Sequence, residues 1–399
     1  MQSFSRKRAL LFTSLTHFAN DGNFLLFSIL IVFFSKLPGV SIAFLGVNAI
    51  LYNVLYGVIS LPIGEFSDRL NNDRLLLAFG IALEGLAAFF FGLGFIYTGY
   101  YIIFVVLGSV ALGSGQAFYH PIGASVLSFV YESKDLGKIL GINGAFGSLG
   151  RALMPSMITF LLLFFGSFRG MEVLAVYVWI LSMIIYFGMS GFTRPYKKHK
   201  KIKKKKYLPE GIKRSLYSAL VPIFLKGAFI MGTVTFIAEY LDKITGSVAF
   251  TGIILTISFI PAILGQPIFG YITTIKGGRF TITLTSVFSL LAFILFLATT
   301  NVVIITFAYA VLAFLIFTGF SVLLDYTYQL VPKEYYSTAY GLVWGAGNIL
   351  GGAFGIALMT YFLTFTNIII AMYYMAGLLL ISIIFLPLLP RPRKSRLLT

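Results

Sequence analysis

The sequence predicts an all-α membrane protein with twelve transmembrane helices in two pseudosymmetric six-helix bundles. Three observations support this fold class. Only 11% of the 399 residues are charged and 58% are hydrophobic, whereas a typical soluble protein has about 25% charged residues. Apolar stretches long enough to cross a bilayer recur twelve times along the chain. The second six stretches also repeat features of the first six at a nearly constant offset.

Each apolar stretch is continuous rather than alternating with a period of two, which favours helices over a membrane barrel. The first six predicted spans are 9–34, 42–63, 75–97, 101–131, 139–165 and 172–192. The second six are 216–240, 248–272, 280–299, 302–330, 337–365 and 367–389. We therefore expect an N-terminal bundle over 1–193, a basic linker over 194–214, and a C-terminal bundle with a short basic tail over 215–399.

The distribution of basic residues predicts the orientation. The net charge is +17, and twenty-five of the 30 Lys and Arg residues fall at the termini, in the linker and in loops on one side of the membrane. The loops of the opposite side hold only Lys36, Arg169 and Lys243. Basic loops are typically cytoplasmic, so we expect a multi-pass protein of the cell membrane with both termini and the linker in the cytoplasm. Topology and contact with anionic lipids account for the positive charge, and we expect no nucleic-acid partner.

The internal repeat shows where the two halves differ. Arg8 and Arg214 lie 206 residues apart, as do Gly64 and Gly270, and further on the offset becomes 200. At five positions, a charged or polar residue in one half corresponds to a residue of a different kind in the other half. The mismatches are Asn20 against Lys226, Asp21 against Gly227, Asp68 against Thr274, His120 against Phe320, and Arg151 against Gly351. A doubled scaffold with unpaired charges is what one site between two moving halves requires.

The segment after the second span carries a motif. Gly64, Asp68 and Arg69 follow one another as glycine, three residues and Asp-Arg, and Arg74 comes five residues later. With the twelve spans and the basic linker, this motif resembles the cytoplasmic loop signature of the major facilitator superfamily. The resemblance implies the major facilitator fold and a cytoplasmic gate in which Asp68 bonds the N-terminus of the eleventh helix, near Ser337.

Two further motifs suggest a closer relationship. LTHFANDG (Leu15–Gly22) and GQAFYHPIGAS (Gly115–Ser125) resemble the fosmidomycin-resistance type of drug-efflux transporter. This resemblance implies proton-driven export of drugs or organic anions. One position departs from the pattern of efflux antiporters, because Arg151 follows Gly150 in the fifth span where those proteins have a proline. This departure favours an alternative function, import of an anionic metabolite by proton symport.

Ionisable residues inside a bilayer are costly and are functional candidates by default. At 1.5 Å per residue, Asp21, His120, Arg151 and Lys226 all lie about 16–20 Å from the cytoplasmic face, near the midplane. We expect proton coupling by Asp21, His17 and His120, since His17 and Asp21 share a helix face. The surplus of positive charge predicts an anionic or zwitterionic cargo. Its expected ligands are Lys226, Arg151, Asn20, Gln116, Tyr119 and Asn348.

Other function classes fit less well. The chain has no cysteine, and its three histidines are widely spaced in sequence, so we find no catalytic set and expect neither an enzyme, a metal site nor a cofactor. A passive channel would not need a gate around Asp68. The sequence therefore predicts a secondary transporter working by alternating access, which we expect to be a monomer.

Overall fold

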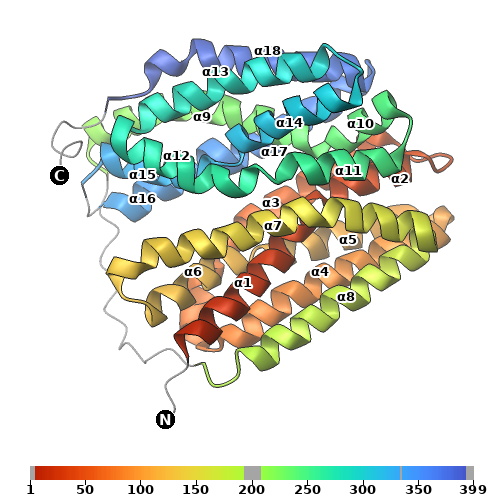
Figure 1. The fold of residues 1–399 in the computed structure, drawn as a ribbon, viewed down its shortest axis with the longest axis horizontal. Helices are drawn as coiled ribbons and strands as arrows, with labels where there is room; N and C mark the ends of the chain where they lie inside the picture. The colour runs from red at the N-terminus through yellow and green to blue at the C-terminus, as the bar shows by residue number, and fades with distance from the viewer. Residues whose placement is uncertain (1–4, 193–207, 333–334, 392–399) are drawn as a thin grey trace. The chain divides into compact units, whose positions relative to one another are not determined.

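The computed structural model describes residues 5–192, 208–332 and 335–391. Every regular element in these ranges is helical (Figure 1). Twelve helical segments are long and apolar enough to cross a membrane, which confirms the predicted all-α class and its twelve spans. They are Arg6–Ser35, Ile42–Ser67, Asp73–Ile96, Thr98–Val130, Lys138–Phe165, Ser167–Gly188, Glu210–Thr235, Val248–Lys276, Gly278–Leu297, Val302–Leu330, Thr338–Phe362 and Ile368–Leu388.

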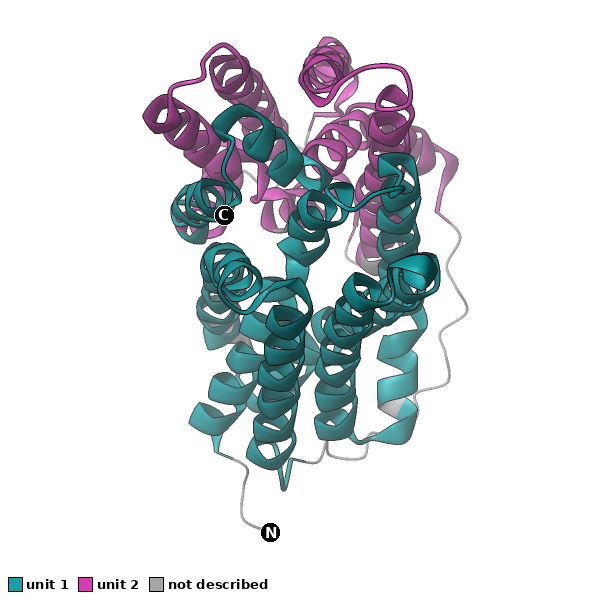
Figure 2. Ribbon diagram, turned by 90° about the vertical axis from the view of Figure 1, so that its right-hand side faces the viewer, with its two compact units in different colours: residues 1–194, 234–263 teal, residues 195–233, 264–399 magenta. Residues whose placement is uncertain are grey.

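The chain forms two compact units (Figure 2). Unit 1 contains residues 1–194 and 234–263, and unit 2 contains residues 195–233 and 264–399. Residues 234–263 thus pack with the N-terminal helices, although they follow the linker in sequence. The division into bundles over 1–193 and 215–399 stays a prediction, and most of the linker between them lies outside the described residues.

In unit 1 the helices of the first six spans pack side by side. α4 runs along α5 and α8, and α1 runs along α7 (Figure 1). The elements of this unit are α1 (Arg6–Gly22), η1 (Asn23–Leu25), α2 (Leu26–Ser35), α3 (Ile42–Leu70), α4 (Asp73–Ile96), η2 (Thr98–Tyr100), α5 (Tyr101–Gln116), α6 (Tyr119–Val130), α7 (Ser133–Phe165), α8 (Ser167–Gly188), α10 (Ile237–Thr245) and α11 (Val248–Phe259).

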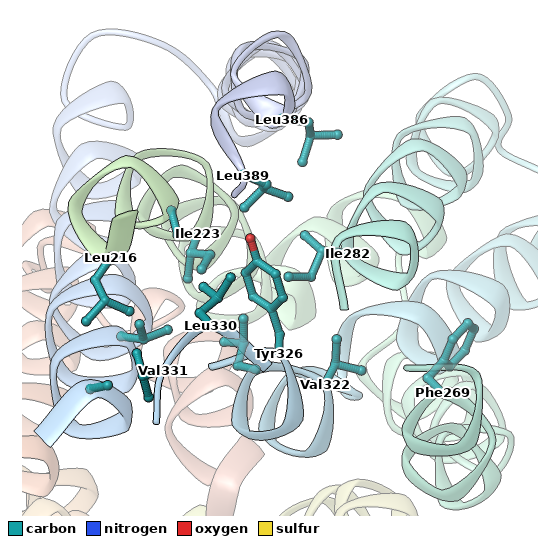
Figure 3. Close-up of a cluster of buried hydrophobic side chains, with 14 of the residues drawn as sticks. Leu216, Ile223, Phe269, Ile282, Val322, Tyr326, Leu330, Val331, Leu386 and Leu389 are labelled. Atoms are coloured by element: carbon teal, nitrogen blue, oxygen red, sulfur yellow. The ribbon is translucent and has the colours of Figure 1, made fainter. Parts of the chain in front are cut away.

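Unit 2 is built around a buried apolar cluster (Figure 3). Tyr326 lies at its centre, and its hydroxyl donates a 2.9 Å hydrogen bond to the Pro390 carbonyl, so the one polar atom of this side chain has a partner. The elements are α9 (Glu210–Thr235), α12 (Ala262–Lys276), α13 (Gly278–Leu297), α14 (Val302–Ile316), α15 (Gly319–Leu330), α16 (Tyr336–Leu342), the π-helical η4 (Val343–Ile349), α17 (Leu350–Phe362), α18 (Ile368–Ile384) and η5 (Leu386–Leu388). The last residues of α9, from Val234 on, belong to unit 1.

Several spans are interrupted near their middle, which the sequence analysis did not predict. The first span changes at Asn23–Leu25 from α-helix to a 3₁₀ turn, and the fourth is broken between Gln116 and Tyr119. The tenth span is broken at the place that corresponds to the break of the fourth, after Ile316, and the seventh span is broken after Thr235. Breaks are tolerated in a membrane only where protein groups satisfy the freed backbone. In the first and fourth spans, polar side chains such as Asp21, Asn23 and His120 lie beside the breaks.

The motif after the second span is not a loop. α3 continues as helix through Gly64 to Leu70, and the chain turns at Asn71, which has a positive φ of 49°. The Ser67 hydroxyl then donates a 2.6 Å hydrogen bond to the Asp73 carboxylate, so it ties the end of α3 to the first turn of α4. The expectation of a loop from Gly64 is wrong, because apolar residues and helix formers carry the helix about two turns further.

One end of unit 1 is fastened by polar contacts between segments far apart in sequence. The Lys36 ammonium lies 2.8 Å from the Asp242 carboxylate, and the Ser35 hydroxyl donates to Glu239 at 3.2 Å. In addition, the Ser156 hydroxyl of α7 donates a 3.1 Å hydrogen bond to the Gly252 carbonyl of α11. Lys36 lies on the side predicted to be non-cytoplasmic. We therefore expect these contacts to keep that end of the unit closed.

We expect substitution of Lys36 by Glu to loosen this closed end. The pair is half exposed, so its loss changes the equilibrium by about 0.2–1 kcal/mol, and repulsion from Asp242 adds to this. The chain has no cysteine, so a single cysteine placed at the buried Val32 reports on opening. Its labelling rate in Lys36→Glu should rise several-fold. Adding Asp242→Lys should restore the slow rate, and a double variant that labels as fast as the single one would contradict the assignment.

Candidate functional site

A buried polar cluster surrounds Asp21 in unit 1. The Arg151 guanidinium of α7 contacts Asp21 Oδ2 directly, and the His17 Nε2 atom lies 3.2 Å from the same oxygen. On the other oxygen, Asn20 donates a 3.0 Å hydrogen bond and His120 Nε2 lies 3.4 Å away. One carboxylate thus has four polar neighbours from three helices, α1, α6 and α7. Pairing and hydrogen bonding of this kind are what make a buried charge tolerable.

Glycines of α7 make room for this cluster. A side chain at Gly147 would collide with the His17 ring and come within 2.8 Å of Asp21 Oδ2. A side chain at Gly150 would collide with the Phe18 carbonyl of α1. Close approach of two helices through small residues is typical of membrane packing. Gly147 and Gly150 thus let α1 and α7 approach closely, whereas Gly141 faces open space.

Asn143 orients the cluster, and the sequence analysis missed it. Its Oδ1 atom accepts hydrogen bonds from the Tyr119 hydroxyl at 2.6 Å and from His17 Nδ1 at 3.0 Å. Its amide nitrogen donates to Ser14 Oγ at 3.3 Å. The Asn143 contact lies on His17 Nδ1, so the opposite ring nitrogen, Nε2, faces Asp21. A lone amide four residues before Gly147 in an apolar span was the available signal.

The structure brings together six of the predicted site residues. Tyr119 joins Asp21, His17, His120, Arg151 and Asn20 through ring contact with His17, with centroids 4.5 Å apart. His120 forms the most exposed edge of the cluster, because 39% of its side chain is exposed against 5% for Asp21. Gln116 is buried at the end of α5. Among the described residues, it is not one of the polar neighbours of Asp21 named above.

His17, Asp21 and His120 also place two nitrogens and a carboxylate oxygen within 4.8 Å of one another, a spacing that a metal ion can accept. The Arg151 guanidinium already occupies the same carboxylate. A second cation would have to share that carboxylate with Arg151, which the like charges oppose. The geometry therefore suits protons better than a metal ion at this position.

Lys226 lies in unit 2, at a small open recess with a cavity volume of about 30 Å³. Its ammonium donates a 2.8 Å hydrogen bond to Thr285 Oγ1. Within the part of the chain that the structure describes, no carboxylate contacts this ammonium. Asn348 of η4 also lines the recess, together with apolar residues. The complete lining is Ile223, Lys226, Gly227, Ile230, Ile282, Thr285, Ile316, Thr318, Gly319, Val322, Leu323 and Asn348.

The expected cytoplasmic gate residues make local contacts. The Arg69 guanidinium pairs at 2.5 Å with Glu65, one turn earlier on α3, and both side chains are largely exposed. The Arg74 guanidinium lies over the Tyr186 ring, 4.8 Å from its centroid. Gly64 is half-buried, and a Cβ there would only touch Pro121 at 4.0 Å. The Asp68 side chain lies outside the described residues, so the gate stays a prediction.

Comparison with known proteins agrees with this architecture. The sequence matches the family described as Major Facilitator Superfamily over residues 13–344 and 223–398. The chain belongs to the major facilitator superfamily. This superfamily consists of membrane transporters rather than enzymes. A curated relative, the probable L-galactonate transporter of Escherichia coli (strain K12), is 28% identical over 133 residues. The match covers 33% of this chain and spans only 28% of that relative's length.

Solved structures of other transporters share the fold. A peptide transporter in complex with alafosfalin superposes with a TM-score of 0.74 at 15% identity, covering 95% of this chain and 93% of that one. A bacterial homologue of the human lysosomal transporter Spinster, in an inward-facing and occupied conformation, gives 0.72 at 15% identity, covering 98% and 97%. At such identities the likeness shows the fold alone. This superfamily member is therefore a multi-pass membrane transporter whose cargo has to be argued from its own residues.

We expect Arg151→Met to destabilise the transporter strongly. It leaves Asp21 buried without its cationic partner, which costs about 3–5 kcal/mol of unfolding free energy. Asp21→Asn combined with Arg151→Met should recover most of that loss, because a neutral amide and a thioether replace the ion pair. Thermal unfolding of the purified single and double variants in detergent measures this. Strictly additive losses would show that the two residues do not act as a pair.

Proposed function

We propose that this protein is a proton-coupled transporter of a small organic anion, working by alternating access. The proposal rests on one observation, that the Arg151 guanidinium contacts the buried Asp21 carboxylate. An anionic cargo that binds Arg151 competes with Asp21 for the same cation. A carboxylate that loses its partner in a dry interior takes up a proton, because burial disfavours its charged form.

This competition links cargo and proton in one direction. Binding of the anion to Arg151 releases Asp21, and one proton from solvent then converts its carboxylate to the neutral acid. Cargo and proton are therefore bound together and released together, which is symport. Loss of the anion returns Asp21 to Arg151 and expels the proton. An exporter of cationic drugs would need the opposite relation, in which cargo and proton exclude each other.

The histidines supply a route for the proton. His120 is the exposed member of the cluster and lies 3.4 Å from Asp21 Oδ1. His17 lies on the inner side and is held by Asn143 with Nε2 toward Asp21. A proton that reaches the Asp21 carboxylate therefore passes His120 first. His17, with its ring fixed, adjusts the charge around Asp21.

Lys226 is proposed as the cargo anchor of unit 2. Its ammonium donates a hydrogen bond to the Thr285 hydroxyl, and the residue lines an open recess. A buried ammonium lacking an acidic partner is costly and is best balanced by an anion. Asn348 lines the same recess and adds an amide that can orient a polar cargo.

The sequence relative supports the class of cargo. L-Galactonate, for which that relative is named, is a sugar acid and thus an organic anion. Export of drugs or organic anions is the second candidate, because the first and fourth spans resemble the fosmidomycin-resistance type. We further propose residence in the cell membrane as a monomer, with cytoplasmic termini and a linker near anionic lipids, from the distribution of Lys and Arg.

Asp21→Asn tests the coupling. In proteoliposomes, an inward proton gradient should drive accumulation of labelled L-galactonate, or of the best anion from a panel of small carboxylates, by the wild-type protein. Asp21→Asn should lose this accumulation and keep exchange of cargo without a gradient, because Arg151 stays available to the anion. The exchange assay is the internal control for folding. Gradient-driven accumulation that survives in Asp21→Asn would refute the coupling, and gradient-driven efflux by the wild type would favour export.

Lys226→Gln tests the anchor. A charge-assisted hydrogen bond contributes about 1.5–3 kcal/mol, so cargo affinity should fall about tenfold or more. The measurement is cargo-dependent thermal stabilisation of purified protein, with the same anion at increasing concentration. Thr285→Val is the matched control, since it removes the neutral partner and keeps the charge. Equal affinities in wild type and Lys226→Gln would exclude Lys226 as a cargo ligand.

A further inference from the structure

A second buried carboxyl group lies in unit 1, and the proposed transport mechanism does not use it. Glu84 of α4 is fully buried, and its Oε2 atom accepts a 2.6 Å hydrogen bond from the Asn23 amide. Among the described residues, its other oxygen, Oε1, has no hydrogen-bond partner. The Asn23 Oδ1 atom is also buried without a partner there. Two orphan acceptors thus belong to one side-chain pair.

Among the described residues, no cation contacts Glu84. α4 packs mainly against α5 and α8, and less extensively against α1, α6 and α3. From α5, Gly115 comes so close that a Cβ there would lie 3.0 Å from Glu84 Cγ. From α8, the Trp179 ring fills the space beside Gly85, and its Nε1–H donates to the Ala82 carbonyl. From α1, the ionisable group that acts on Glu84 is Asp21, and it is acidic.

An ionised carboxylate does not fit this environment. Burying a charge with a single hydrogen bond and no counter-ion costs several kcal/mol. The neutral acid removes that cost and also solves the problem of the two orphan acceptors. A proton on Oε1 supplies the one donor that the pair lacks, and Asn23 Oδ1 is the acceptor without a donor. The carboxylic acid and the carboxamide then satisfy each other.

The internal repeat argues against a purely structural reason for the pair. At the offset of 206, Asn23 corresponds to Phe229 and Glu84 to Leu290. Phe229 is fully buried in unit 2 and its ring packs on Phe293 at 5.0 Å between centroids. Contact between these two spans is therefore made by apolar residues in the second copy. The second copy therefore lacks both the acid and the amide, and the two polar residues are found together in the first copy.

We propose that Glu84 is a second proton-binding site, which holds one proton as a neutral acid bonded to Asn23. It lies across the interruption of the first span from the Asp21 cluster, because Asp21 and Asn23 flank Gly22 where α1 ends. A negative charge on Asp21 opposes ionisation of Glu84. The protein thus carries a stored proton next to the group that exchanges one.

Infrared spectroscopy tests this without any transport assay, so its result is independent of the proposed coupling. Purified wild-type protein at neutral pH should show the carbonyl stretch of a protonated carboxyl group, which shifts in deuterated buffer. Glu84→Gln should lose one such group per molecule, and Asp21→Asn should keep it. An unchanged band in folded Glu84→Gln would overturn the proposal.

Asn23→Leu provides a second variant that keeps the acid. Without the amide, the Glu84 carboxyl loses its hydrogen-bond partner, and its carbonyl stretch should move to higher wavenumber with unchanged intensity. The matched control is Asn20→Leu, which removes the neighbouring amide that donates to Asp21 and should leave the band in place. A band that is absent or unmoved in Asn23→Leu would contradict the acid–amide pair, and it keeps the proposal testable if Glu84→Gln does not fold.

Discussion

The ion pair between Asp21 and Arg151 is the constraint on which the N-terminal unit depends. Neither charge is tolerable alone at the middle of a bilayer, so α1 and α7 have to meet closely enough to join them. Gly147 and Gly150 allow that approach. The pair also explains the polar neighbours, since each remaining lone pair of the carboxylate needs a donor. Asn143 then fixes His17 so that the cluster has one arrangement rather than several.

The same ion pair also suggests how a proton and an anion could be exchanged at this site. We propose that an anion competing for Arg151 changes the charge state of Asp21, because these two charges are in direct contact. The interruptions of the first and fourth spans place His17, Asp21 and His120 where helix backbone is already irregular. Irregular backbone lets helix ends shift without breaking a full set of hydrogen bonds. The site and the flexible points of the spans therefore coincide.

The sequence was sufficient for the fold and for most members of the cluster, and physical reasons explain both outcomes. Apolar length determines spans directly, and depth along a helix placed Asp21, His120 and Arg151 at one level. Which side chains meet also depends on the rotation of each helix about its axis, which counting residues along the chain does not give, and Asn143 was missed for this reason. The helix breaks were also missed, because 3₁₀ and π turns in apolar segments follow from packing rather than from local residue type. The extension of α3 past Gly64 shows the same limit at a helix end.

The asymmetry between the two units bears most directly on the cargo. Unit 1 balances its buried Arg151 with Asp21, whereas the Lys226 ammonium of unit 2 contacts a neutral hydroxyl and, within the described residues, no acid. If Lys226 only stabilised helix packing, an apolar residue would do so at lower cost, as Phe229 and Leu290 do where unit 1 has Asn23 and Glu84. A buried cation that is kept without a counter-ion is explained by a partner that comes and goes. The same reasoning applies to Arg151, whose partner has to be neutralised by a proton when the cargo replaces it. We therefore propose that both cations serve an anionic cargo, and that Asp21, which contacts Arg151, ties that anion to a proton.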